Sequence, residues 1–95
     1  MTSKVHFQFL VEYILNDIGK KIIELIERKK RLPSKICEKT HLYFDLGIDS
    51  LAFVEFLLEI EQTFSIIIEI SEMESCLLVG SLIANVKNKM GNEND

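Results

Sequence analysis

The sequence predicts a small all-α bundle of three main helices plus one short helix, with a long loop between the first and second helices. Apolar residues recur at helical spacing in three segments, residues 5–30, 50–63 and 79–89. The segment with strand-like β-branching, residues 65–70, has no second strand in the chain to pair with. A chain of 95 residues buries one modest core, so we expect a single domain over residues 1–95.

The first predicted helix carries the longest apolar stripe. It comprises Phe7, Leu10, Val11, Ile14, Ile18, Ile22, Leu25 and Ile26. This pattern predicts one long helix or two helices with a break near Gly19, with residues 1–12 as an N-terminal extension. The helix should end at the basic segment 27–31, because cations suit a helix C-terminus and Pro33 forces the preceding residue out of the α region.

The remaining elements follow in order. Residues 32–47 have no sustained period and form the long loop, pinned by the apolar residues Ile36, Leu42 and Phe44. The second helix covers residues 50–63, and residues 65–70 form a connector whose isoleucines fill the core. A short helical turn is expected at residues 71–76, followed by the last helix and a frayed tail over residues 90–95. The last helix should bury Val79, Leu82, Ile83 and Val86.

Composition and charge restrict the possible partners. Apolar residues make up 47% of the chain, which excludes intrinsic disorder. Residues 1–40 hold nine basic and five acidic residues, a net charge of +4, whereas residues 41–95 hold two basic and ten acidic residues, a net charge of −8. The acidic half argues against nucleic acid and favours partners with basic patches. No cleavable signal or spanning segment is visible, so we expect a cytoplasmic monomer without stable membrane insertion.

Metal and redox chemistry find no support in the sequence. Cys37 and Cys76 are far apart and, like His6 and His41, have no ligand spacing around them. We interpret both cysteines as reduced thiols that pack in the structure.

Ser50 stands at the start of the second helix in the stretch "FDLGIDSLAFVEFLLEIEQTF". It follows Asp49, and Gly47 permits a tight turn before it. No base is nearby, and His41 would have to fold back from the loop, so Ser50 is a poor catalytic nucleophile. A helix N-terminus favours a capping oxygen or a bound phosphodiester, and from position alone either Asp49 or Ser50 serves as a cap.

The motif "DLGIDSL" followed by "VEFLLEIEQTF", with "VGSLIANV" near the end, resembles the acyl carrier protein family. The resemblance covers residues 36–88. It implies an acyl-carrier-like bundle without catalytic activity of its own. It also implies a covalent 4′-phosphopantetheine arm, which a phosphopantetheinyl transferase transfers from coenzyme A to Ser50. Asp49 would then assist the transferase with Mg²⁺ during loading, and Asp45 would be largely structural.

The resemblance also implies a partner surface and an acyl pocket. Loading and synthase enzymes with basic docking patches would contact the second helix, whose acidic face is otherwise an ordinary solvated surface. The partner residues would be Leu51, Val54, Glu55, Leu58 and Glu59, of which the apolar members could instead belong to the core. The acyl pocket would be lined by Phe53, Leu57, Ile60, Met73 and Ile83.

Several positions depart from the family pattern. Phe53 and Met73 stand where relatives carry smaller residues, which predicts a narrowed pocket and a cargo that is short or stays outside the bundle. "EISEME" replaces a proline and an acidic pair, so the short third helix is expected to be displaced or frayed. The basic segment 27–31 is either a solvated helix end or a contact for a specialised enzyme or lipid surface.

The sequence therefore allows three alternative functions. The first is a discrete acyl carrier protein for fatty-acid, polyketide or specialised lipid synthesis. The second is an aminoacyl or peptidyl carrier with the same arm, which the narrowed pocket favours. The third is an unmodified helical interaction module.

Overall fold

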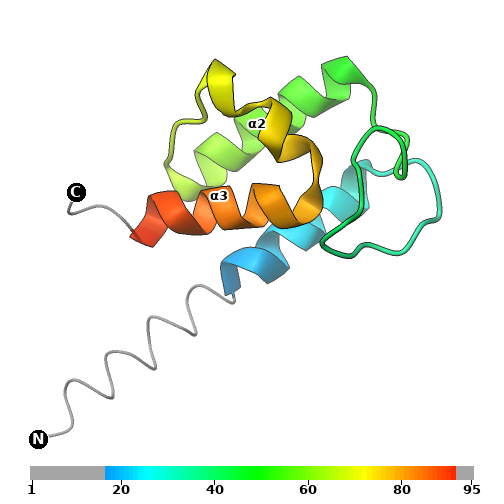
Figure 1. The fold of residues 1–95 in the computed structure, drawn as a ribbon, viewed down its shortest axis with the longest axis horizontal. Coiled ribbons are helices and arrows are strands. Elements are labelled where there is room, and N and C mark those ends of the chain that lie inside the picture. The colour runs from blue at the N-terminus through cyan, green and yellow to red at the C-terminus, as the bar shows by residue number, and fades with distance from the viewer. Residues whose placement is uncertain (1–16, 92–95) are drawn as a thin grey trace, which may run out of the picture.

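The computed structural model describes residues 17–91, and the predicted N-terminal extension over residues 1–12 lies outside them. Within these residues, three helices surround one core (Figure 1). The described part of the first helix covers residues 17–29. It is followed by a long loop, α2 (Ser50–Phe64), two short 3-10 turns, η1 (Ile70–Glu72) and η2 (Glu74–Leu77), and α3 (Val79–Gly91). The predicted all-α fold class is confirmed.

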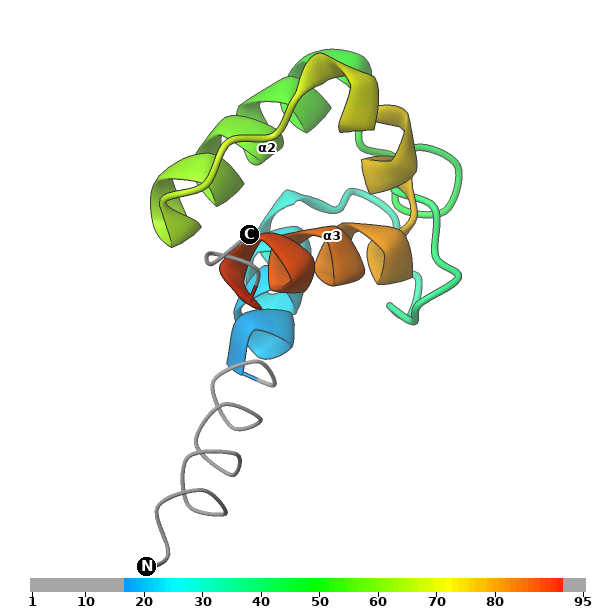
Figure 2. The same ribbon diagram turned by 60° about the vertical axis from the view of Figure 1, so that its left-hand side comes forward.

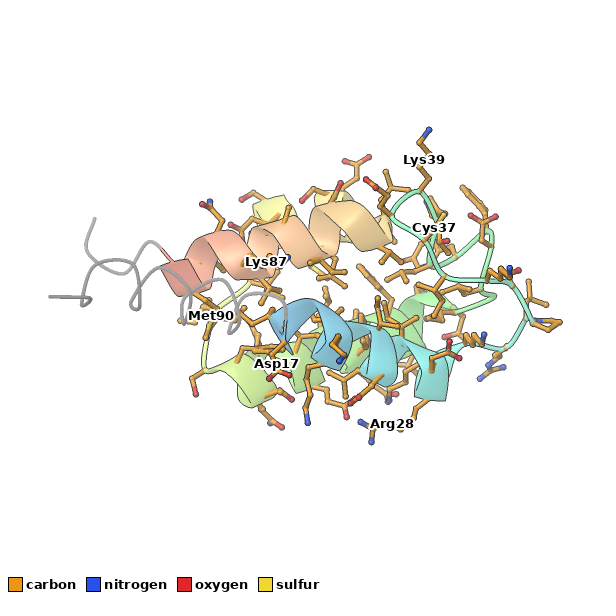
Figure 3. The ribbon with its side chains drawn as sticks, turned by 90° about the horizontal axis from the view of Figure 1, so that it is seen from below. Asp17, Arg28, Cys37, Lys39, Lys87 and Met90 are labelled. Carbon is orange, nitrogen blue, oxygen red and sulfur yellow. The ribbon has the colours of Figure 1, made fainter. Side chains whose placement is uncertain are left out.

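Within the described residues the first helix is continuous from residue 17 to residue 29, with no break at Gly19. A Cβ on this glycine would lie 3.8 Å from Ile83 Cγ2, an ordinary contact, which shows how closely α3 approaches the first helix. Figures 1 and 3 show the first helix running alongside α3. All four apolar positions of its described stripe are buried: Ile18, Ile22, Leu25 and Ile26.

The core is completed by the inner faces of the other helices and by the long loop. α2 contributes Phe53, Phe56, Leu57 and Ile60, and α3 contributes Val79, Leu82 and Val86. Leu42, Leu46 and Ile48 of the loop are also buried. Side chains from a segment without regular structure therefore fix the position from which α2 begins.

Backbone hydrogen bonds attach the loop to η2 and to the start of α3. The N–H groups of Val79 and Gly80 donate to the carbonyls of Thr40 at 3.0 Å and Glu38 at 2.9 Å, and Leu42 donates to Leu77 at 2.8 Å. A single antiparallel bridge, between His41 and Leu78, is the extent of sheet-like pairing in residues 17–91.

The connector after α2 takes the irregular form that the sequence predicts. Ser65 ends the helix in the left-handed conformation, with φ of 55°. Ile66 and Ile68 pack against the core, but Ile67 and Ile70 are 70% and 86% exposed, so only alternate isoleucines fill the core. The predicted short helix appears as the two 3-10 turns, and Figure 2 shows them crossing from α2 towards the start of α3.

Two termini differ from the expectation in detail. α2 extends one residue past the predicted end, to Phe64, and α3 extends two residues past Lys89, to Gly91. η1 begins with a capping box between Glu69 and Glu72, which stabilises a 3-10 start in the absence of a proline.

Candidate functional site

Ser50 is the first residue of α2, and its side chain is exposed. Asp49 caps the helix instead: its Oδ1 accepts a hydrogen bond from the Ala52 N–H at 2.8 Å, and its carbonyl accepts one from the Phe53 N–H at 2.8 Å. Within residues 17–91 the Ser50 hydroxyl makes no hydrogen bond. Asp49 therefore caps the helix, and the serine oxygen is not occupied by a capping hydrogen bond.

The turn before α2 depends on a glycine. Gly47 has φ of +71°, in the left-handed region, and its N–H donates to the Tyr43 carbonyl at 3.0 Å. The Leu46 carbonyl accepts from the N–H groups of Arg31 at 2.8 Å and Leu32 at 3.1 Å. These bonds hold the end of the first helix against the turn that presents the serine.

Asp45 has a structural role, as the family resemblance implies. Its Oδ2 accepts from the His41 N–H at 2.7 Å, and its carbonyl accepts from the Ser34 hydroxyl at 2.8 Å. No group of three metal-ligating side chains occurs among the described residues.

His41 is the one histidine of residues 17–91, and its geometry argues against a role as general base. Its Nδ1 accepts from the Tyr43 N–H at 3.1 Å and the Phe44 N–H at 3.2 Å, so its lone pair already serves the turn. Its ring stacks on that of Phe44, with centroids 4.3 Å apart. The Nδ1 lone pair of His41 is therefore not available to activate Ser50.

The start of α2 suits an attached phosphodiester. The N–H groups of Ser50 and Leu51 take no part in hydrogen bonds among the described residues, because the Asp49 cap uses only the following two. Two free donors at the positive end of a helix dipole, beside an exposed hydroxyl, form a favourable place for a negative charge.

An apolar stripe leads away from Ser50 along the outer face of α2. Leu51 is 68% exposed, Val54 41% and Leu58 53%. These three residues lie along one face of the helix, whereas the opposite face is buried. They belong to the surface of the isolated chain, and not to its core.

The acidic side chains of α2 are less free than the sequence suggests. Glu55 is exposed, but Glu59 forms an ion pair with Lys29 of the first helix at 3.6 Å. The Oε2 of Glu61 accepts from the Ile68 N–H at 2.8 Å and so holds the connector to α2. Sequence reasoning missed both contacts, because each joins segments whose proximity is set by tertiary packing.

A cleft of about 160 Å³ lies between α2 and the connector, starting one helical turn after Ser50. Its apolar walls include Leu57 and Met73, both of which were expected to line an acyl pocket. Glu61 supplies its one charged wall. The lining residues are Val54, Leu57, Leu58, Glu61, Ile68 and Met73.

The other three residues expected in the pocket lie elsewhere. Phe53 is buried and packs edge-on against Tyr43, with ring centroids 5.4 Å apart, and Ile60 is buried in the core. Ile83 is half-buried and lies towards Gly19 of the first helix. A larger hollow of about 460 Å³ is found near Ser65, at the end of α2 opposite to Ser50.

The two cysteines differ from each other. Cys76 is buried, and burial raises the pKa of its thiol. Cys37 is exposed, so the prediction that it packs inside is wrong, and hydrogen bonding with Thr40 lowers the pKa of its thiol. The reason is that Cys37 lies in the loop where Thr40, and not the thiol, turns inward.

The all-α fold places an exposed serine, whose hydroxyl makes no hydrogen bond in residues 17–91, at the start of α2. The chain belongs to the phosphopantetheine attachment site family, whose model matches residues 20–86. It is 30% identical over 77 residues to the acyl carrier protein of Amoebophilus asiaticus, an alignment that covers 80% of this chain and 96% of the relative.

Two further relatives are of the same kind. The chain is 28% identical over 76 residues to the acyl carrier protein of Thermotoga maritima, covering 79% of this chain and 94% of the relative. It is 30% identical over 79 residues to the acyl carrier protein of an Exiguobacterium species, covering 83% and 96%.

Membership of this family settles the general chemistry. The protein is a non-catalytic carrier with a covalent 4′-phosphopantetheine cofactor. Such carriers are modified by phosphopantetheinyl transferases and interact with synthases. No helix within residues 17–91 has the length and apolar character needed to span a membrane.

Proposed function

We propose that the protein is a discrete acyl carrier protein in which Ser50 bears the arm. The observation that carries this proposal is the position of Ser50: an exposed hydroxyl without a structural duty, one helical turn from an apolar cleft. The thiol of the arm supplies the thioester bond to the cargo. Residues 1–95 act as one domain.

Loading requires little of this chain. The Ser50 oxygen forms a bond to the β-phosphorus of coenzyme A, the bond from that phosphorus to the departing 3′,5′-ADP breaks, and a base of the transferase takes the proton. Asp49 keeps one carboxylate oxygen on the Ala52 N–H, and the exposed carboxylate assists the transferase with Mg²⁺.

Partner enzymes dock on α2. Leu51, Val54 and Leu58 form the apolar centre of the contact, because their exposed fractions leave apolar area available beside the arm. Glu55 meets basic residues of the partner directly. Glu59 also contacts basic residues of the partner, either after its ion pair with Lys29 breaks or while it is still paired. Breaking that pair costs little, since a half-exposed ion pair at 3.6 Å is weak.

The cleft points to a short acyl chain. Its volume of about 160 Å³ corresponds to roughly five groups of water size at about 30 Å³ each. Leu57 and Met73 contact the acyl chain directly, while Phe53 and Ile60 belong to the packed core layer. Longer cargo would have to displace that layer, which is costly in a small domain.

Intact-mass measurement tests the carrier function. The full chain is incubated with coenzyme A, Mg²⁺ and a broad-specificity phosphopantetheinyl transferase, beside a Ser50→Ala variant and a Ser65→Ala control. We expect a mass gain equal to one 4′-phosphopantetheine in the wild type and the control only. No gain in the wild type would leave the unmodified interaction module.

The cargo is tested on the loaded protein. Butanoyl and dodecanoyl thioesters are attached, and the methyl and amide resonances of Leu57, Ile68 and Met73 are compared with those of the thiol form. We expect the butanoyl chain to shift them, and the dodecanoyl chain to leave Phe53 and Ile83 unmoved. Strong shifts at the latter two would contradict a short cleft, whereas loading only by an aminoacyl-activating enzyme would identify an aminoacyl carrier.

A further inference from the structure

The side chains of two arginines in the basic segment 27–31 form no ion pair or hydrogen bond within the described part of the chain. Lys29 is paired with Glu59, and Lys30 is paired with Glu27 at 3.0 Å and donates to the Ser34 carbonyl at 3.1 Å. Arg28 and Arg31 are exposed, and no ion pair of residues 17–91 includes them. In this segment the two lysines are therefore paired with nearby groups, whereas the two arginine side chains remain available to bind an anion.

Arg31 differs from Arg28 in its location. Its N–H donates to the Leu46 carbonyl at 2.8 Å, and its Cβ lies 3.5 Å from the position that a Cβ on Gly47 would occupy. Gly47 precedes Ser50 by three residues, which span at most about 11 Å. The long side chain of Arg31 therefore starts at the turn that presents the serine.

The charged side chains within this turn are all negative. Residues 41–51 contain two carboxylates, Asp45 and Asp49, and no lysine or arginine. A phosphodiester on Ser50 would add a third negative charge to this region. The helix dipole compensates part of it, and a cation beside the turn is the natural complement.

We propose that Arg31 is a positioning residue for the phosphodiester of the arm on Ser50, which its guanidinium contacts from the Gly47 side. This inference rests on the proposed function, because it requires the arm to be attached at Ser50. The contact would orient the arm at the start of α2, so that the thioester end is directed along the helix towards the cleft.

The test is a thermodynamic cycle that compares each protein before and after loading. Wild type, Arg31→Gln and Arg28→Gln are unfolded with urea in both forms, at low and at high ionic strength. Arg28→Gln is the matched control, because it removes the same charge from an exposed site that does not contact the turn. The cycle isolates the coupling between each arginine and the arm from any general effect of the substitution.

We expect loading to make Arg31→Gln less stable relative to wild type by up to about fivefold in the unfolding equilibrium constant, as an exposed pair allows. This coupling should vanish in 1 M salt, where the screening length is about 3 Å. Arg28→Gln should show no coupling. Arg31→Lys should recover part of it, because the charge remains but the planar donor fork is lost.

A direct spectroscopic readout accompanies the cycle. The phosphorus-31 resonance of the loaded protein should move in Arg31→Gln and not in Arg28→Gln, and the Arg31 Nε–H resonance should shift on loading. Equal behaviour of the two arginine variants, or a coupling that salt does not weaken, would overturn the inference while leaving the carrier function intact. Lost enzyme affinity in Arg31→Gln with no coupling to the arm would assign Arg31 to partner docking and also overturn it. Absence of loading at Ser50 would overturn both proposals.

Discussion

Two glycines inside helices should respond in opposite directions to the same substitution. Gly19 lies within the first helix and Gly80 in the first turn of α3. Helix propensity alone predicts that alanine stabilises both, by roughly 0.5–1 kcal/mol. At Gly19 the added Cβ would meet Ile83 Cγ2 at 3.8 Å, so the space is available and the gain should be realised.

At Gly80 the tertiary structure reverses the sign. An added Cβ would lie 2.8 Å from Glu38 Cβ and 2.9 Å from the Glu38 carbonyl oxygen, closer than real Cβ atoms approach. The loop must therefore move, which weakens the bond from the Gly80 N–H to that carbonyl, now 2.9 Å. Overpacking typically costs 1–3 kcal/mol, so after the propensity gain we expect Gly80→Ala to destabilise by about 1–2 kcal/mol.

Urea unfolding followed by circular dichroism measures both variants. With a slope of about 1 kcal/mol per M, at the lower end of the usual range, the midpoint of Gly80→Ala should fall by about 1–2 M and that of Gly19→Ala should rise by about 0.5–1 M. Amide exchange at Val79, whose N–H donates to the Thr40 carbonyl, should accelerate only in Gly80→Ala. If both variants were stabilised, the close approach of the loop to α3 would be refuted.

Three further outcomes are expected. Asp49→Ala should lose about 0.5–2 kcal/mol of stability in urea unfolding through loss of the helix cap, and Asp49→Asn should retain most of it, whereas equal losses would contradict a capping role. The hydrogen bond from Lys89 at 2.9 Å holds the pKa of Glu72 below its ordinary 4.5. The ionised carboxylate therefore stabilises the fold above that pH, and this contribution disappears as the pH falls through the lower pKa of the folded state. The urea midpoint of Glu72→Gln should decline less steeply with acid than that of the wild type, and an unchanged pH profile would rule the pair out as a stabilising contact. Iodoacetamide should alkylate Cys37 in the folded protein and leave Cys76 untouched, as peptide mass mapping would show, and equal labelling would mean that Cys76 is accessible.

Tertiary packing decided which polar side chains remain available for function. Glu55, Glu59 and Glu61 read alike in the sequence, yet only Glu55 is without a structural contact. The difference arises because Lys29 and Ile68 are brought to α2 by the crossing of the first helix and by the connector. Spacing along one helix contains no information about such neighbours.

The same distinction holds for the cleft. The sequence identified Leu57 and Met73 as pocket residues, but it could not show that the ring of Phe53 turns onto Tyr43 and leaves the cleft to smaller side chains. It also could not show that Thr40 and not Cys37 turns inward. Side-chain direction in an irregular loop depends on contacts that close only in the folded state.

The sequence by itself determined the three helices, the irregular connector and the serine at the start of α2, because helical periodicity, turn residues and a family motif are local patterns of residue types. Only the tertiary structure decided that Asp49 takes the cap and leaves the Ser50 hydroxyl free, and that Arg31 stands beside the Gly47 turn. The cap is a local contact that the sequence left open between Asp49 and Ser50. The position of Arg31 depends on the distance between segments far apart in the chain, and such distances are fixed when the common core forms.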